Sequence, residues 1–241
     1  MVERKEGLDF FTAIRRRRSI REFTGDKIPD EDIEKIIDTA RYAPSPENFQ
    51  NVRYILIRKD QDLKKTIADI CQEASGELFG SAPYELTQGR LWYMPESRRP
   101  ATFKDMRDGS LFRYPEKSDS LIVCCASESY HDSPLIYPNE YFGSVTLGMA
   151  IQSMWTAAST LGYGVGYQAF PVMEPRRAEY ICDEIGIPRL WKPISVLCIG
   201  VPIKPLRMVG PSRWPLEGFF FEERWGNPYL RKAFREQWRR R

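Results

Sequence analysis

One segment, residues 141–161, limits the folds open to this chain more than any other. Apolar side chains cover most of the circumference of the helix that we predict there, namely Val145, Leu147, Met149, Ile151, Met154, Trp155 and Ala158. A helix that is apolar nearly all round belongs in a core and not on a surface. We therefore expect it at the centre of the fold, buried by other elements and in part by another subunit.

Shorter amphipathic and apolar segments alternate with one another along the rest of the chain. The clearest begins at Pro29 and Asp30, and it repeats isoleucine or alanine at helical spacing as far as Ala40. We predict further helices at 10–14, 62–73 and 174–185, and strands at 52–57, 121–126, 162–167 and 193–201. Because helices and strands alternate, with no internal repeat and no linker between two cores, residues 1–241 are predicted to form one α/β domain.

Two stretches do not fit this alternation. Residues 77–118 are interrupted by glycines and prolines, yet they are rich in aromatic and basic side chains. A loop of this length is typically a functional lid or a disordered insert, and the aromatic content favours a lid. Residues 203–241 read as an extended C-terminal tail with a basic end.

Charge and cysteine content restrict the class of protein. With 36 basic and 33 acidic residues, the near balance argues against a general nucleic-acid coat. The five cysteines form no Cys-x-x-Cys pair, so we expect buried, reduced thiols. No apolar run approaches membrane-spanning length, and the N-terminus leads into no signal core. We therefore expect a cytoplasmic protein without a membrane partner.

The chain offers few residues for catalysis by its own side chains. It has one histidine, His131, which excludes a multi-histidine metal site and leaves no Ser-His-Asp arrangement suggested by position. We therefore predict no metal and no catalytic nucleophile, acid or base. An enzyme of this composition would take its chemistry from a cofactor.

The most informative motif is a run of arginines after the first predicted helix. Arg17, Arg18 and Arg21 flank the hydroxyl of Ser19. Guanidinium groups match phosphate oxygens in a bidentate way, and a hydroxyl adds a donor. A solvated basic face at a helix end explains the same run, so both interpretations stay open on these residues alone.

A proline-locked turn follows the second predicted helix. Pro44 and Pro46 restrict φ at alternate positions and leave Ser45, Asn48 and Gln50 as fixed donors and acceptors. Such a turn either lines a site or only ends a helix.

The glycines of 162–166 lack the spacing and context of a dinucleotide loop, and they indicate a close approach by a ligand or by another backbone.

Taken together, these segments resemble the nitroreductase family of flavin mononucleotide oxidoreductases. Residues 17–23 are similar to the opening Arg-Arg-Ser-x-Arg-x-Phe of that family, and residues 40–50 to its Ala-x-x-Ala-Pro-Ser-x-x-Asn-x-Gln. Residues 199–202 resemble its closing Gly-Tyr-Pro strand, and residues 213–217 its Arg-x-Pro-Leu-Glu. The resemblance implies an α+β nitroreductase-like fold, with a central, mostly antiparallel sheet flanked by helices, in an intertwined homodimer.

The same resemblance implies a flavin site shared by two subunits. One chain would contribute Arg17, Arg18 and Ser19 at the FMN phosphate, Arg21 at the ring and ribityl oxygens, and the backbone of Tyr167, Gln168 and Ala169 near N5 and O4. The other chain would contribute Pro44, Ser45, Pro46 and Asn48. Arg213 would return to the phosphate from the tail, with Arg207 as its competitor.

In function, the resemblance implies tightly bound FMN, NAD(P)H as reductant and a small-molecule, electron-poor acceptor such as a nitroaromatic or a quinone, in a ping-pong reaction. Reductive dehalogenation or breakdown of the flavin is an alternative within the family. A non-catalytic basic module that binds nucleic acid or a nucleotide is an alternative from another class, because residues 231–241 interleave arginine and lysine with aromatic side chains. We favour packing of those aromatics on a partner subunit over nucleic-acid binding.

Overall fold

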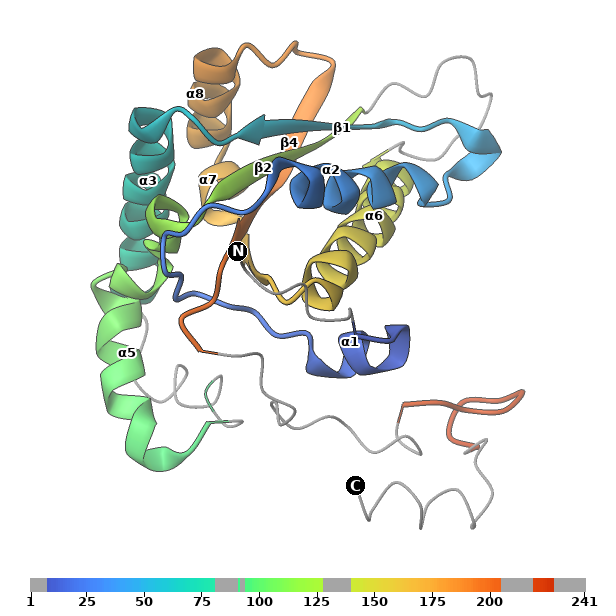
Figure 1. Ribbon diagram of the computed structural model, residues 1–241, viewed down its shortest axis with the longest axis horizontal. Coiled ribbons are helices and arrows are strands. Elements are labelled where there is room, and N and C mark those ends of the chain that lie inside the picture. The colour runs from blue at the N-terminus through green and yellow to red at the C-terminus, as the bar shows by residue number, and fades with distance from the viewer. Residues whose placement is uncertain (1–7, 81–90, 92–93, 128–139, 205–218, 228–241) are drawn as a thin grey trace. The chain divides into compact units, whose positions relative to one another are not determined.

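The computed structural model describes residues 8–80, 91, 94–127, 140–204 and 219–227 (Figure 1). Two compact units make up the chain, Met1–Val209 and Gly210–Arg241. All helices and strands below belong to the first unit. In the second, residues 219–227 form a tight turn in which the Phe221 and Trp225 rings lie 4.9 Å apart.

The first unit is built on a four-stranded sheet in the order β1-β2-β4-β3. Its strands are β1 (Val52–Ile57), β2 (Ser120–Ser127), β3 (Gly164–Gln168) and β4 (Trp191–Gly200), and every neighbouring pair is antiparallel. The α+β class with an antiparallel sheet is therefore confirmed, and the α/β class inferred from alternation is wrong. Alternation states which element follows which, but it does not determine the direction in which the chain re-enters the sheet.

Helices cover both faces of this sheet (Figure 1). They are α1 (Phe10–Arg16), α2 (Asp30–Asp38), α3 (Gln61–Gly80), α5 (Arg99–Arg107), α6 (Glu140–Thr160), α7 (Phe170–Met173) and α8 (Pro175–Ile185). Along β2, Ile122, Cys124 and Ala126 face the cluster that contains α2 and α6, while Leu121, Val123 and Cys125 face α3 and α8. This alternation is the period of two of a strand with both faces buried.

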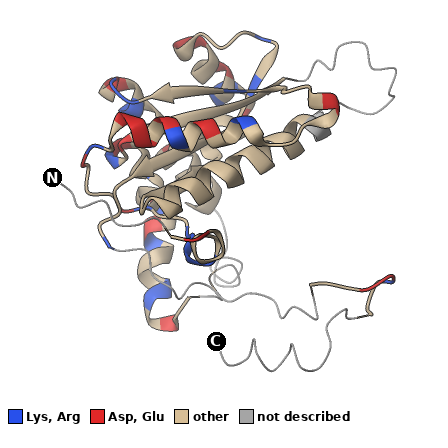
Figure 2. Ribbon diagram, turned by 45° about the vertical axis from the view of Figure 1, so that its right-hand side comes forward, with Lys and Arg blue, Asp and Glu red and all other residues tan. Residues whose placement is uncertain are grey.

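The long apolar helix α6 is central, as predicted. Leu147, Ala150, Met154 and Ala158 are buried against the sheet and α2. A stripe of small and apolar positions nevertheless stays exposed in the single chain, namely Ser144, Val145 and Gly148, and the polar Gln152 continues it. In contrast, α2 carries mostly acidic side chains, with Lys35 as its one basic residue (Figure 2).

The predicted helices and strands are confirmed within a few residues, but the stretch 77–118 differs from a loop. α3 continues to Gly80, and α5 is flanked by 3-10 turns at Glu96–Arg98, Ser110–Phe112 and Tyr114–Lys117. Of its described aromatics, Phe79 and Tyr114 are buried, and the half-buried Phe112 ring lies 5.9 Å from Phe79 and 4.8 Å from Phe170. Pro100 and Pro115 stand in the first turns of helices, where a missing N–H breaks no hydrogen bond. The role of this stretch as a lid stays a prediction.

All five cysteines are free thiols, as expected from their spacing. Cys71, Cys124, Cys125 and Cys198 are buried, and Cys182 is half-buried. Burial raises the pKa of Cys71 and Cys124, since the charged thiolate is poorly solvated in the core. These thiols are therefore packing groups and not nucleophiles.

Candidate functional site

The arginine segment begins where α1 ends. The carboxylate of Asp9 accepts a hydrogen bond from the Thr12 backbone N–H at 3.1 Å and so caps the start of this helix. At the other end, the Arg17 N–H donates to the Ala13 carbonyl at 2.8 Å. The chain then leaves the helix and runs beside the sheet, so the next residues are held at a fixed place along β3.

Two arginines of this segment have defined surroundings at the helix end. The Arg17 guanidinium lies 4.5 Å from the ring centroid of Trp155 on α6, a side chain that is only 8% exposed. Stacking on a buried ring orients the guanidinium plane. Arg18 Nη1 donates to the Arg15 and Arg17 carbonyls at 2.7 and 2.6 Å, and thereby satisfies the last carbonyls of α1.

Ser19 and the following residues continue the sheet beyond β3. Ser19 forms a parallel bridge with Val165, and the Ile20 N–H donates to the Val165 carbonyl at 3.0 Å. Further on, Phe23 pairs with Pro202 in an antiparallel bridge. These backbone bonds make the arginine segment a rigid part of the fold and not a free basic arm.

The glycines of β3 are explained by this close packing. A Cβ on Gly164 would lie 2.8 Å from Ile20 Cγ2. A Cβ on Gly166 would lie 2.3 Å from Tyr114 Cε2 and 2.7 Å from the Ile20 carbonyl oxygen. The structure therefore shows a close approach at two of these glycines, by the Ile20 side chain at Gly164 and by the Tyr114 ring and the Ile20 carbonyl at Gly166.

The end of β3 is hydrogen-bonded to Tyr114, a residue that the sequence did not reveal. Tyr167 is 40% exposed, and its carbonyl accepts a hydrogen bond from the Tyr114 hydroxyl at 2.7 Å. Burial raises the pKa of Tyr114, while the nearby Arg21 acts in the opposite direction by charge and hydrogen bonding. Gln168, only 1% exposed, donates its side-chain amide to the Phe112 carbonyl at 2.7 Å.

Trp155 and Tyr114 are thus the site residues that sequence reasoning missed. Trp155 reads as one more apolar residue of α6, and Tyr114 lies in a segment of ambiguous structure. Only their contacts with Arg17, Arg21 and β3 reveal their place, and no spacing in the sequence encodes contacts over such separations.

The turn at 44–50 holds its shape through its own backbone. Ser45 Oγ accepts the Gln50 N–H at 2.9 Å, and the Ser45 carbonyl accepts the Asn48 N–H at 3.0 Å. Glu47, Asn48 and Gln50 have φ angles of 52°, 57° and 50°, which lie in the left-handed region that L-residues rarely adopt. Such strained conformations cluster at binding and active sites.

The arginine segment and this turn do not meet within one chain. In Figure 1, the turn lies at the right-hand end of α2 and β1, whereas the arginine segment follows α1 below α6. Pro44 and Asn48 are exposed, and Ser45 and Pro46 are half-buried. Arg213, its competitor Arg207 and the basic residues of 231–241 lie outside the described residues.

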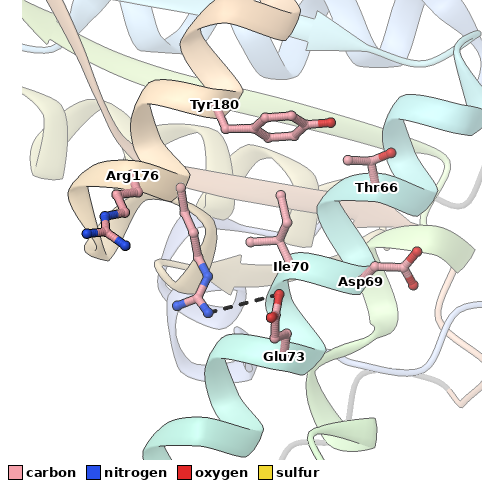
Figure 3. A pocket seen from close by; sticks show the side chains of 7 residues that line it. Thr66, Asp69, Ile70, Glu73, Arg176 and Tyr180 are labelled. Carbon is pink, nitrogen blue, oxygen red and sulfur yellow. Dashed lines mark ion pairs between the residues drawn. The ribbon is translucent and has the colours of Figure 1, made fainter.

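Two further observations bear on the chemistry. A depression of about 360 Å³ between α3 and α8 is lined by Thr66, Asp69, Ile70, Glu73, Arg176, Arg177 and Tyr180 (Figure 3). Arg177 pairs there with Glu73 at 4.0 Å, and none of the predicted site residues lines it.

Within the described residues, no group of three or more His, Cys, Asp or Glu side chains could hold a metal ion, and no helix is long and apolar enough to cross a membrane.

The segment 17–21 has the donor chemistry that a phosphate monoester requires. It carries three guanidinium groups and one hydroxyl within five residues, on a backbone fixed by α1 and β3. Arginine donors in a fixed frame are the usual means of binding a dianionic phosphate. The residues therefore fit the phosphate end of FMN.

Comparison with known proteins identifies the family. The model of the nitroreductase family matches residues 14–201, which include the arginine segment, the turn and all four strands. The chain therefore belongs to the nitroreductase family.

Two curated relatives and one solved structure illustrate the range of this similarity. The iodotyrosine deiodinase of Nematostella vectensis is 24% identical over 218 residues, which cover 89% of this chain and 75% of that protein. The 5,6-dimethylbenzimidazole synthase of Rhodospirillum rubrum is 28% identical over 203 residues, 82% of this chain and 83% of that protein. A nitroreductase from Desulfovibrio desulfuricans, solved in complex with FMN, has a TM-score of 0.60 at 21% identity and covers 90% of this chain and 98% of its own.

Proposed function

We propose that this chain is an FMN-dependent oxidoreductase that acts in the cytoplasm on an electron-poor small molecule. The observation that carries the proposal is the segment 17–21, which presents three guanidinium groups and a hydroxyl on a rigid backbone beside β3. When bound, FMN would supply the redox chemistry, by taking hydride from NAD(P)H at N5 and passing electrons to a nitroaromatic, a quinone or a similar acceptor in ping-pong order. Membership of the nitroreductase family supports this reaction class.

At the phosphate end, Arg17, Arg18 and Ser19 would bind the cofactor. The Trp155 ring fixes the plane of the Arg17 guanidinium, and the carbonyls at the end of α1 fix Arg18. Because these side chains are already ordered, little rotamer entropy is lost when a phosphate binds. Tight binding of FMN is expected on this ground.

At the ring end, Arg21 and the backbone of Tyr167, Gln168 and Ala169 would face the flavin. The Gln168 side chain is turned inward to the Phe112 carbonyl, so this residue contributes through its backbone. A guanidinium near the pyrimidine end of the ring favours negative charge there, and a backbone donor near N5 orients the reacting atom. No side chain of the protein needs to act as a nucleophile.

The second half of the site would come from the partner in a homodimer. Pro44, Ser45, Pro46 and Asn48 form an ordered polar turn that one chain leaves remote from its own arginine segment (Figure 1). The exposed stripe on α6 and the exposed Phe10 and Phe11 of α1 offer apolar surface for such a partner. A second chain would bury this surface and bring its turn to the arginines.

An anaerobic absorbance titration tests the proposal. The protein as purified is expected to show the absorbance of bound FMN, which bleaches on addition of NADH or NADPH and returns when a quinone or nitroaromatic is added. A protein that neither carries nor takes up FMN would refute the cofactor. A bound flavin that neither nicotinamide reduces would refute the reductant.

The names of two relatives suggest other flavin reactions as alternative functions. One curated relative is named an iodotyrosine deiodinase and another a 5,6-dimethylbenzimidazole synthase. Analysis of products separates the three reactions: iodide release from iodotyrosine indicates reductive dehalogenation, formation of dimethylbenzimidazole from FMN under oxygen indicates flavin breakdown, and conversion of a nitro group or quinone indicates the favoured function.

A further inference from the structure

Tyr114 is a buried tyrosine whose ring lies between β3 and the segment that carries Arg21. It begins the 3-10 turn Tyr114–Lys117 and is 5% exposed. Its ring lies against Gly166 of β3, where an added Cβ would come within 2.3 Å of Cε2, and 6.4 Å from the Phe23 ring in an edge-to-face contact. The ring therefore lies against β3 and against Phe23, two residues after Arg21.

The hydroxyl of Tyr114 points to the same place. It donates to the Tyr167 carbonyl at 2.7 Å, at the end of β3. A phenolic oxygen has one proton to donate and keeps lone pairs to accept. With the proton committed to Tyr167, the lone pairs are left for a donor, and Arg21 is a nearby cation whose charge acts to lower the pKa of this hydroxyl.

We propose that Tyr114 is a positioning residue for the flavin site, which holds Arg21 and the end of β3 in one hydrogen-bonded chain. The inference rests on the proposed function, and it deepens that function by adding a residue outside the family motifs quoted above. Through Tyr114, the stretch 94–118 is fixed to the residues expected at the flavin ring.

The physical need for such a residue lies in Arg21 itself. Its side chain is long and exposed at the surface of a single chain. A free arginine side chain loses about 2 kcal/mol of rotamer entropy when a ligand immobilises it. A partner that already holds the guanidinium reduces that loss, and burial keeps the Tyr114 hydroxyl protonated as a donor to Tyr167.

The test compares Tyr114→Phe with a matched control elsewhere, Tyr163→Phe. The first substitution keeps the ring beside Gly166 and removes only the hydroxyl. Tyr163 is half-buried and donates its hydroxyl to Asp32 Oδ2 of α2 at 2.7 Å, so its phenylalanine variant loses a hydrogen bond of similar length that involves neither Arg21 nor the end of β3. Both variants, with the wild type, are measured for FMN dissociation constant, midpoint potential of the bound FMN and melting temperature.

Tyr114→Phe is expected to weaken FMN binding by about tenfold, the equivalent of one hydrogen bond to a charged group. It is also expected to lower the midpoint potential, because a loosened Arg21 stabilises negative charge on the ring less well. Tyr163→Phe is expected to lower the melting temperature with no change in either flavin property. If Tyr114 were important only for stability, Tyr114→Phe would behave like Tyr163→Phe. Both variants would then have a lower melting temperature and an unchanged midpoint potential of the bound FMN.

The same substitution made in the Arg21→Gln variant shows whether Tyr114 acts through Arg21. In Arg21→Gln, adding Tyr114→Phe is expected to change the FMN dissociation constant by less than about twofold, since the interaction is already lost. Wild-type affinity and potential in Tyr114→Phe would overturn the inference, and so would additive effects of the two substitutions. If the wild type itself binds no FMN, the proposed function falls and takes this inference with it, which is a different result from an unaffected variant.

Discussion

The arginine segment at 17–21 and the turn at 44–50 are both expected to bind one cofactor, yet they are built in opposite ways. The arginine segment depends on distant parts of the chain: β3 pairs with its backbone, and the Trp155 ring orders the Arg17 side chain. The turn depends on itself, through the bond between Ser45 and Gln50 and three residues in the left-handed region.

This difference indicates how a site divided between subunits can be assembled. A segment built into the core of its own chain is ordered before the partner arrives. A turn presented to another chain cannot rely on that chain for its shape, so local hydrogen bonds and restricted φ angles must order it. The comparison therefore predicts different responses to substitution in the two regions.

The largest expected effect is the loss of FMN affinity when the arginine segment and the turn are each altered by substitution. Arg17→Gln removes charge-assisted hydrogen bonds to the phosphate and is expected to weaken FMN binding by about 100-fold. The double variant Ser45→Ala/Asn48→Ala removes two neutral hydrogen-bonding groups and is expected to weaken it by about 30-fold. Calorimetric or fluorescence titration of each protein measures both losses.

Mixing the two defective chains then tests the division between subunits. In a homodimer of the expected kind, a mixed dimer has one site with both defects and one site with neither. Random exchange should therefore restore wild-type affinity to about one quarter of all sites. If both halves came from the same chain, mixing would restore none. Arg15→Gln serves as the control, because it removes a neighbouring cation, at the end of α1, that is not expected at the cofactor.

The next effect concerns the tight packing of β3. Gly166→Ala would place a methyl group within 2.3 Å of a Tyr114 ring carbon and 2.7 Å of the Ile20 carbonyl oxygen. Overpacking of this kind lowers the free energy of unfolding by about 1–3 kcal/mol, and FMN affinity should fall with it because Arg21 and Tyr114 move apart.

Gly76→Ala is the matched control for that substitution. Gly76 lies inside α3, and an added Cβ would have the Arg107 carbonyl oxygen at 3.6 Å, an ordinary contact. Replacing a helical glycine by alanine raises the free energy of unfolding by about 0.5–1 kcal/mol. Chemical denaturation of both variants checks the contrast. Equal effects of the two substitutions would show that β3 can shift to accommodate the added methyl group.

Much of the fold was accessible from the sequence because local rules determined it. The cap at Asp9, the apolar repeat of α2 and the apolar face of α6 predicted helices that the structure confirms. The direction of the strands was not accessible from alternation, and two helices of the stretch 94–118 were missed because their prolines stand in first turns. Local signals report which element forms, whereas strand direction depends on how the whole chain packs.

The candidate site divides in the same way. The arginines and the prolines of the turn were visible as motifs, since chemistry of that kind requires particular residue types. Trp155 and Tyr114 were not, because each matters only through a neighbour far away in the chain. The turn illustrates a third case, in which prolines indicated rigidity but gave no sign of the left-handed angles that follow them.

A smaller effect is expected from relaxing the turn. Glu47 is exposed and has a φ angle of 52°, in the left-handed region that L-residues rarely adopt, so its backbone is strained. Glu47→Gly is expected to be about 1 kcal/mol more stable than Glu47→Ala, because only glycine adopts this region freely. FMN binding should nevertheless weaken about threefold in the glycine variant, since a turn with more conformations loses more entropy on binding. An alanine variant as stable as the glycine variant would show that the turn is not strained.

The smallest expected effect is a pH dependence at the start of α1, which leads into the arginine segment. Hydrogen bonds from the Thr12 side chain and backbone N–H lower the pKa of Asp9 from its ordinary value of 3.8. A carboxyl whose pKa is lower in the folded state stabilises the fold above its unfolded pKa, and this contribution disappears as the pH falls through the folded value. Asp9→Asn keeps a capping side chain but removes the charge. The variant should therefore have a slightly lower urea midpoint than the wild type at pH 7, and the two midpoints should converge as the pH falls through the lowered pKa of Asp9. A difference that persists unchanged at low pH would mean that the capping geometry, and not the charge, holds α1 in place before the arginines.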